Sequence, residues 1–209
     1  MGYTTEFSGE FKINKPLDDD TYKLLDGLSK TRRMARNVGP EYGVEGEFYI
    51  EGSGFMGQDD EDNVINSNQP PKTQPGLWCQ WRPTDDKEYI EWDGGEKFYN
   101  YVEWIEYIIE KILRPRGYSL TGQVAWYGEE SEDTGFINIE DNEVRTEVGE
   151  TFYFGDTDED RRLKIAVSKL TIMTPQEKKA ASVLLETFIE GKSEELEELL
   201  KGLCVESEI

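Results

Sequence analysis

The stretch from Gln74 to Trp104 most constrains the fold, because its hydrophobic pattern changes from that of strands to that of a helix. It holds four of the five tryptophans and the only Gly-Gly pair. Residues 77–82 and 88–92 alternate as two strands of a hairpin. The Gly94-Gly95 pair then breaks the second strand, and apolar residues recur at helical spacing from about Tyr99 to Leu113. The stretch predicts a β-hairpin followed by a long amphipathic helix.

Alternating segments elsewhere in residues 1–148 predict further strands. The odd positions of residues 3–13 hold Tyr3, Thr5, Phe7, Phe11 and Ile13, which marks a strand with one buried face. The acids at 18–20 suit the start of a short helix that ends near Ser29. The other expected strands cover residues 47–51, 118–127, 134–140 and 143–148. The last three are joined by short turns, which is typical of an antiparallel meander. We therefore expect an α+β fold, a mainly antiparallel sheet with helices packed on a face.

The C-terminal part of the chain differs in character. Residues 149–160 read as an acidic linker between a core domain at 1–148 and a small, mostly helical extension at 161–209. Residues 161–172 fit a strand or a helix equally well. Thr174-Pro175-Gln176-Glu177 is a strong helix start, with a capping threonine and proline at the first helical position.

The composition removes several classes of chemistry. The chain has no histidine, so it lacks the commonest general base and metal ligand. It has no phosphate-binding glycine motif, and its two distant cysteines make neither a disulfide framework nor a zinc site. These absences favour a non-enzymatic protein without a cofactor. No signal peptide and no membrane-length apolar run is visible, so we expect a cytoplasmic location.

The formal net charge is −22, and it is spread along the chain. Such a field disfavours direct nucleic-acid binding, because that binding needs basic residues that neutralise phosphates. The simpler interpretation is that this charge only keeps the protein soluble. The more specific hypothesis is a surface that imitates nucleic acid and binds a basic partner. The acids best placed for this are in the expected loops, in the runs Asp59–Asp62 and Glu129–Asp133.

A basic cluster stands out against this acidity. It contains Lys30, Arg32, Arg33 and Arg36. We expect these side chains to form surface ion pairs with the plentiful carboxylates, which individually contribute little stability. The alternative is an anion-binding site, because guanidinium groups match the geometry of phosphate and carboxylate.

Two further groups of side chains lie near the Gly-Gly break. Glu91, Asp93 and Glu96 would cap the following helix and line the turn, or alternatively hold a metal ion or act as acid and base. The aromatic group contains Trp78, Trp81 and Trp92. We expect the tryptophans to belong to the core, with a ligand platform as the alternative.

Several motifs together resemble a family of small hypothetical proteins found in bacteria and their phages. The motifs are QPGLWCQW, EWDGGEKFY, TRRMAR, the opening MGYTTEFSGEF, and Asp141-Asn142 followed by Val144. The resemblance covers about residues 1–148, and the segment from Phe152 onward departs from it. It implies no particular activity and carries over no catalytic residue. Phage relatives favour a host-directed inhibitor, whereas bacterial relatives need no such role.

Three hypotheses follow from the sequence. The leading one is an acidic, non-enzymatic binding protein of phage or bacterial origin that occupies a basic surface of a host protein. The alternative is a small-ligand protein or metal-dependent enzyme acting on a phosphorylated molecule, with the arginines holding the anion. These two are distinguished by whether the arginine cluster and the Gly94-Gly95 turn share a cleft. The third is a structural or assembly protein with no active site.

Overall fold

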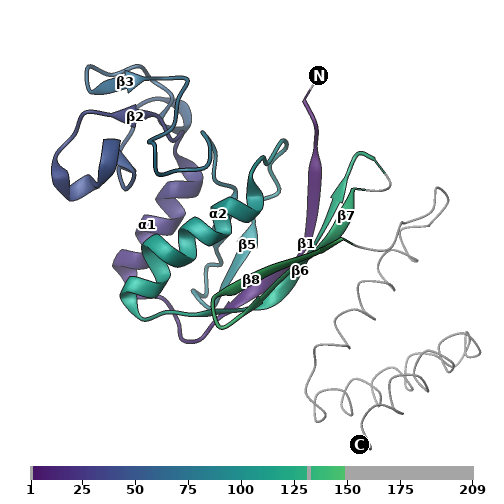
Figure 1. Cartoon of the computed structure of the whole chain (residues 1–209). Helices are drawn as coiled ribbons and strands as arrows, with labels where there is room; N and C mark the ends of the chain where they lie inside the picture. The colour runs from purple at the N-terminus through teal and green to yellow at the C-terminus, as the bar shows by residue number, and fades with distance from the viewer. Residues whose placement is uncertain (1, 131–132, 149–209) are drawn as a thin grey trace, which may run out of the picture. The chain divides into compact units, whose positions relative to one another are not determined.

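The computed structural model describes residues 2–130 and 133–148, which form a six-stranded antiparallel sheet with two α-helices (Figure 1). The sheet has the strand order β4-β5-β1-β6-β7-β8, and a separate two-stranded sheet joins β2 to β3. The strands are β1 (Thr5–Ile13), β2 (Ala35–Arg36), β3 (Val64–Asn66), β4 (Trp81–Pro83), β5 (Tyr89–Trp92), β6 (Leu120–Gly128), β7 (Thr134–Glu140) and β8 (Glu143–Val148). The helices are α1 (Asp19–Lys30) and α2 (Tyr101–Ile108). The expected α+β class and antiparallel sheet are confirmed.

One apolar core joins the sheet to both helices, which lie on the same side of it (Figure 1). The alternation predicted for β1 places Phe7, Phe11 and Ile13 in this core. α1 contributes Leu25 and Leu28, and α2 contributes a larger set, Trp104, Ile105, Tyr107 and Ile108. No helix in the two described ranges is long and apolar enough to cross a bilayer.

The acids before α1 act as the sequence predicts. Asp18 is the N-cap, and its Oδ1 accepts a 2.8 Å hydrogen bond from the backbone N–H of Thr21. The Tyr118 hydroxyl donates to the other carboxylate oxygen of Asp18 at 2.8 Å, which ties the start of the helix to the start of β6. These two hydrogen bonds lower the pKa of Asp18.

The predicted hairpin exists but is shorter on its first strand. Trp81 pairs with Trp92 across β4 and β5, while residues 77–80 are not strand. The predicted long helix begins at Tyr101, and after Ile108 it continues as a π-turn (Ile109–Leu113) and a 3-10 turn (Arg114–Arg116). β7 and β8 have the predicted bounds.

The predicted strand at residues 47–51 is wrong. In this segment the carbonyl oxygens of Glu47 and Tyr49 accept hydrogen bonds from the Arg33 side chain instead of a neighbouring strand. The local strand pairing forms between β2 and β3.

The chain divides into two compact units, Met1–Phe152 and Tyr153–Ile209. The linker predicted at 149–160 and the helical extension predicted at 161–209 lie outside the described residues. The boundaries of these parts stay a prediction.

Candidate functional site

The segment between α1 and β4 contains the most unusual arrangement of charge in the chain. We call residues 32–77 the arginine-anchored lobe, because three arginines at its start hold the rest of it together. It contains β2, β3 and three short 3-10 turns, η1 (Pro40–Tyr42), η2 (Val44–Gly46) and η3 (Phe55–Gly57). With so little regular structure, side-chain hydrogen bonds must fix its shape.

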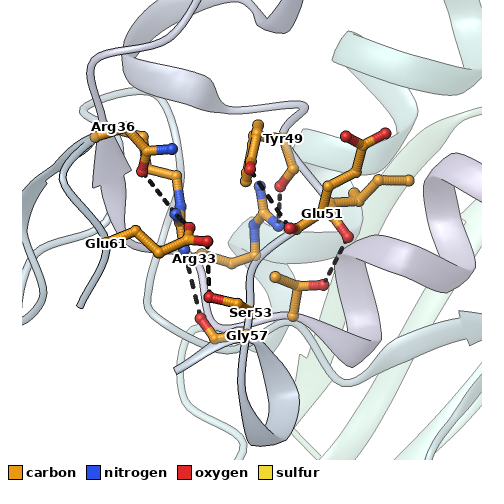
Figure 2. A network of polar contacts seen from close by, with 10 residues as sticks. Arg33, Arg36, Tyr49, Glu51, Ser53, Gly57 and Glu61 are labelled. Atoms are coloured by element: carbon orange, nitrogen blue, oxygen red, sulfur yellow. Dashed lines mark hydrogen bonds and ion pairs between the residues drawn. The ribbon is translucent and has the colours of Figure 1, made fainter. Parts of the chain in front are cut away.

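Arg33 is the innermost of these anchors, with 2% of its surface exposed. Its guanidinium donates to the carbonyl oxygen of Tyr49 at 2.7 Å (Figure 2). It also donates to the carbonyl oxygens of Glu47 at 3.1 Å and Gly46 at 3.4 Å. It also donates to Oε1 of Gln74 at 3.3 Å. Burial lowers the pKa of Arg33 to about 10, which leaves the group charged at neutral pH. The N–H donors of this planar guanidinium therefore bind acceptors within the protein.

Arg36 is equally buried but has an acidic partner. Its guanidinium forms an ion pair with Glu61 (Figure 2). It also donates to Asn63 Oδ1 at 2.8 Å. It lies over the Tyr49 ring, 4.8 Å from the ring centroid. The Ser53 hydroxyl donates to Glu61 at 2.7 Å, and these hydrogen bonds from Ser53 and Arg36 lower the pKa of Glu61. One buried cation thus joins three separate turns of the lobe.

Arg32 is only half-buried. Its side chain donates to the Ser67 carbonyl at 3.1 and 3.2 Å, and it lies 5.7 Å from the centroid of the Trp78 ring. The expectation of surface ion pairs is wrong for Arg33, which is buried and bonds chiefly to backbone carbonyls. For Arg36 the expected pairing with a carboxylate is confirmed, but the pair with Glu61 is not at the surface, because Arg36 is buried. Anion binding by the cluster stays a prediction, and of the three side chains only Arg32 is accessible to solvent.

A second buried network attaches the lobe to α2. The Tyr107 hydroxyl donates to the carboxylate of Glu47 at 3.2 Å. The Gln74 amide donates to the Tyr107 oxygen at 3.2 Å and to the Glu47 carbonyl at 2.7 Å. Burial is the largest cause that raises the pKa of Tyr107, so its hydroxyl remains a donor at neutral pH. These contacts fix the lobe on a rigid element of the fold.

The charged residues in the middle segment of the lobe, residues 37–71, are all acidic. Residues 37–71 contain eight carboxylates and neither lysine nor arginine. Glu47 is buried, Glu61 pairs with Arg36, and Glu45 pairs with Lys72 at 2.8 Å. The other five are exposed and have no ion pair within residues 2–130 and 133–148: Glu41, Glu51, Asp59, Asp60 and Asp62. Arg33 and Arg36 are thus buried in the lobe, whereas five acids of residues 37–71 are exposed, as is Lys72, which pairs with Glu45.

A glycine-rich loop of the lobe exposes two large apolar side chains. We call residues 52–58 the Phe55 tip, because Phe55 is 80% exposed and Met56 beside it is 40% exposed. The Met56 carbonyl accepts from the Arg32 backbone N–H at 2.8 Å, and the Gly57 carbonyl accepts from Arg36 at 3.4 Å (Figure 2). Sequence reasoning missed Phe55. The available signal was an aromatic residue within Gly52-Ser53-Gly54-Phe55-Met56-Gly57, where no periodicity assigns it to a core face.

The three acids around the Gly-Gly turn serve separate local roles. Glu91 pairs with Arg82 at 2.8 Å, and Asp93 accepts from the Gly95 N–H at 2.7 Å within the turn. Partial burial raises the pKa of Asp93. The side chain of Glu96 is exposed. The prediction that these acids cap the next helix is wrong, because α2 starts after Asn100 and its first turn has no side-chain cap. Lining of the turn is confirmed for Asp93.

The alternative of a metal site gains no support from the geometry. No group of three or more Asp, Glu or Cys that could hold a metal ion occurs in the part of the chain that the structure describes. Within the same residues, no hydrogen bond or ion pair joins Glu91, Asp93 or Glu96 to any of the three arginines.

The tryptophans differ in accessibility. Trp81 is completely buried, packs edge-on against Phe7 at 5.3 Å, and donates to the Tyr101 carbonyl at 2.8 Å. Its assignment to the core is confirmed, and its ring has no free face for a ligand. Trp92 is half-buried and donates to Gln80 at 3.1 Å, while Trp78 is half-buried beside Arg32.

Comparison with known proteins adds no relative. No protein-family model, curated protein or solved structure matches the chain.

Proposed function

We propose that this chain is an acidic, non-enzymatic protein of phage or bacterial origin, and that it binds a basic surface of a host protein. The observation that supports the proposal best is the charge arrangement of the arginine-anchored lobe. Its middle segment, residues 37–71, has eight acids and no basic residue, while Arg33 and Arg36 are buried. Residues 37–71 therefore present exposed charge of one sign, on a backbone that the buried arginines hold.

An acidic segment of this kind suits a lysine- and arginine-rich partner. Clustered charge of one sign raises the rate of association with an oppositely charged surface. We propose a nucleic-acid-binding groove as the basic surface, because lysine and arginine side chains line such a groove to neutralise phosphates. Direct nucleic-acid binding is disfavoured, because five exposed acids of the lobe would repel phosphates.

The test compares two variants that each remove three negative charges. Asp59→Asn, Asp60→Asn and Asp62→Asn together neutralise the lobe and keep Glu61, which pairs with buried Arg36. Glu103→Gln, Glu106→Gln and Glu140→Gln form the control, since these acids are exposed on α2 and at the end of β7. The partner is captured from host lysate by the full chain, then purified for kinetics.

We expect the lobe variant to slow association about tenfold at low salt and the control variant to slow it less than twofold. Binding of the unmodified chain should weaken as salt rises and should compete with DNA or RNA for the partner. Equal association rates for the two variants, or an affinity that ignores both salt and excess nucleic acid, would exclude the proposal.

A further inference from the structure

We propose that the Phe55 tip is the apolar anchor of this interface, and that Phe55 enters an apolar pocket bordered by lysine or arginine on the partner protein. The inference rests on the proposed function and names the side chain that supplies most of the non-electrostatic affinity. Steering by carboxylates chiefly affects association, whereas buried aromatic anchors chiefly set how slowly a complex dissociates.

The exposure of Phe55 is the first observation. Its side chain is 80% exposed, and it is the most exposed aromatic residue among the large apolar residues in the part of the chain that the structure describes. The structure packs other aromatic residues densely into the core, including Phe7, Phe11 and Phe98. Phe55 and Met56 are two adjacent exposed apolar side chains, and exposed acids flank them in sequence. Apolar groups with a polar border are a feature of interaction sites.

The tip is also pre-formed. Met56 has φ 54°, in the left-handed region that long side chains rarely adopt, and it follows Gly54 at φ 80°. Such a conformation persists only where surrounding contacts hold it. Here the Arg32 N–H holds the Met56 carbonyl at 2.8 Å, and the Asp59 N–H holds the Ser53 carbonyl at 3.1 Å. A tip fixed in advance loses little conformational entropy on binding.

Charge identifies the occupant of the interface as a protein. Glu51, Asp59, Asp60 and Asp62 flank the tip in sequence and are exposed. Acids in these positions repel the anionic lipids of a membrane surface and the phosphates of nucleic acid, and they attract cationic side chains. An apolar pocket within a basic protein surface complements both the ring and its acidic border. Grooves that bind single-stranded nucleic acid combine these same two features.

The experiment uses the full chain with a photoreactive benzoylphenylalanine at position 55 or, as the control, at position 65. Ile65 on β3 is 59% exposed in the same lobe but outside the tip. The partner purified for the previous test is irradiated with each form. We expect crosslinking from position 55 to a partner peptide that contains lysine or arginine and an apolar segment, with weaker crosslinking from position 65.

Affinities measured on Phe55→Ala and Ile65→Ala complete the test. Phe55→Ala should weaken binding at least tenfold, mainly by faster dissociation, with an unchanged salt dependence. Ile65→Ala should stay within twofold of the unmodified chain. Both variants should have nearly the melting temperature of the unmodified chain, because each replaced side chain is exposed. Phe55→Ala binding within twofold, or crosslinking from position 65 alone, would overturn the inference.

The two proposals fail separately. A partner whose affinity depends on salt and not on Phe55 would retain the charge-based function and reject the anchor. A partner whose affinity depends on Phe55 and not on salt would retain the anchor and reject the charge-based function. Phe55-dependent binding to phosphatidylcholine vesicles would overturn the assignment of a protein pocket.

Discussion

At the scale of single residues, Arg33 shows how a charge can be buried without a carboxylate partner. Three backbone carbonyls and the Gln74 side chain surround its guanidinium, and they offset the cost of removing the charge from water. The contacts come from residues 46–49 and 74, so a single side chain fixes two distant parts of the lobe.

Replacing Arg33 by lysine should destabilise the protein by about 3 kcal/mol. A lysine has three donors on one nitrogen and cannot reach all four acceptors of the guanidinium, so buried carbonyls lose their partners. Arg32→Lys is the matched control, because Arg32 is half-buried, and it should cost about 1 kcal/mol. Urea unfolding measures both changes, and an equal loss in the two variants would contradict the anchoring role of Arg33.

The buried thiol of Cys79 predicts a loss of stability at alkaline pH. Burial raises its pKa from 9.0 to about 12, so between these values the folded state holds a proton that the unfolded state has lost. The contribution of the protonated thiol to the free energy of unfolding is complete below pH 9. It falls by about 1.4 kcal/mol per pH unit as the pH rises towards 12. Urea unfolding at pH 8 to 11 should show a smaller decline for Cys79→Ala. Parallel declines would rule out a contribution from Cys79.

At the scale of elements, the two-residue turn between β7 and β8 depends on more than backbone conformation. Asp141 and Asn142 have φ values of 45° and 72°, as a tight hairpin turn requires. Asn142 is also buried: its side-chain oxygen accepts from the Leu120 N–H at 2.8 Å, and its amide donates to the Tyr118 carbonyl at 3.1 Å. The turn therefore joins the hairpin to the start of β6.

Glycine should consequently have opposite effects at the two positions. Asp141→Gly relieves left-handed strain on an exposed residue, so stability should stay the same or rise by up to about 1 kcal/mol. Asn142→Gly keeps the turn but leaves the buried Leu120 N–H without its partner, at a cost of about 2 kcal/mol. Thermal unfolding compares them. A stable Asn142→Gly variant would show that turn conformation alone matters.

At the scale of the whole molecule, the net charge of −22 predicts that salt stabilises the fold. Repulsion among like charges destabilises a compact state, and ions screen it over about 8 Å at physiological ionic strength. The melting temperature should therefore rise with sodium chloride up to about 0.5 M. The variant with Asp59, Asp60 and Asp62 changed to Asn should show a smaller rise. A melting temperature that falls with salt would mean that ion pairs outweigh the repulsion.

The sequence by itself determined the elements whose signals are local. The period of two in β1, the short turns around β7 and β8, and the capping acid Asp18 each depend on residues close together in the chain. These signals were sufficient for the α+β class and for the apolar face of α2. They also placed Trp81 correctly in the core.

Only the tertiary structure decided that Arg33 and Arg36 are buried and that Phe55 is exposed. Arg33 finds its acceptors 13 to 41 residues away, and three of the four are backbone carbonyls. Every residue type carries the same carbonyl, so no side-chain pattern marks which ones a guanidinium will reach. Arg33 and Arg36 are buried, whereas five of the eight acids of residues 37–71 are exposed. Phe55, in the loop between Glu51 and Asp59, is exposed with them.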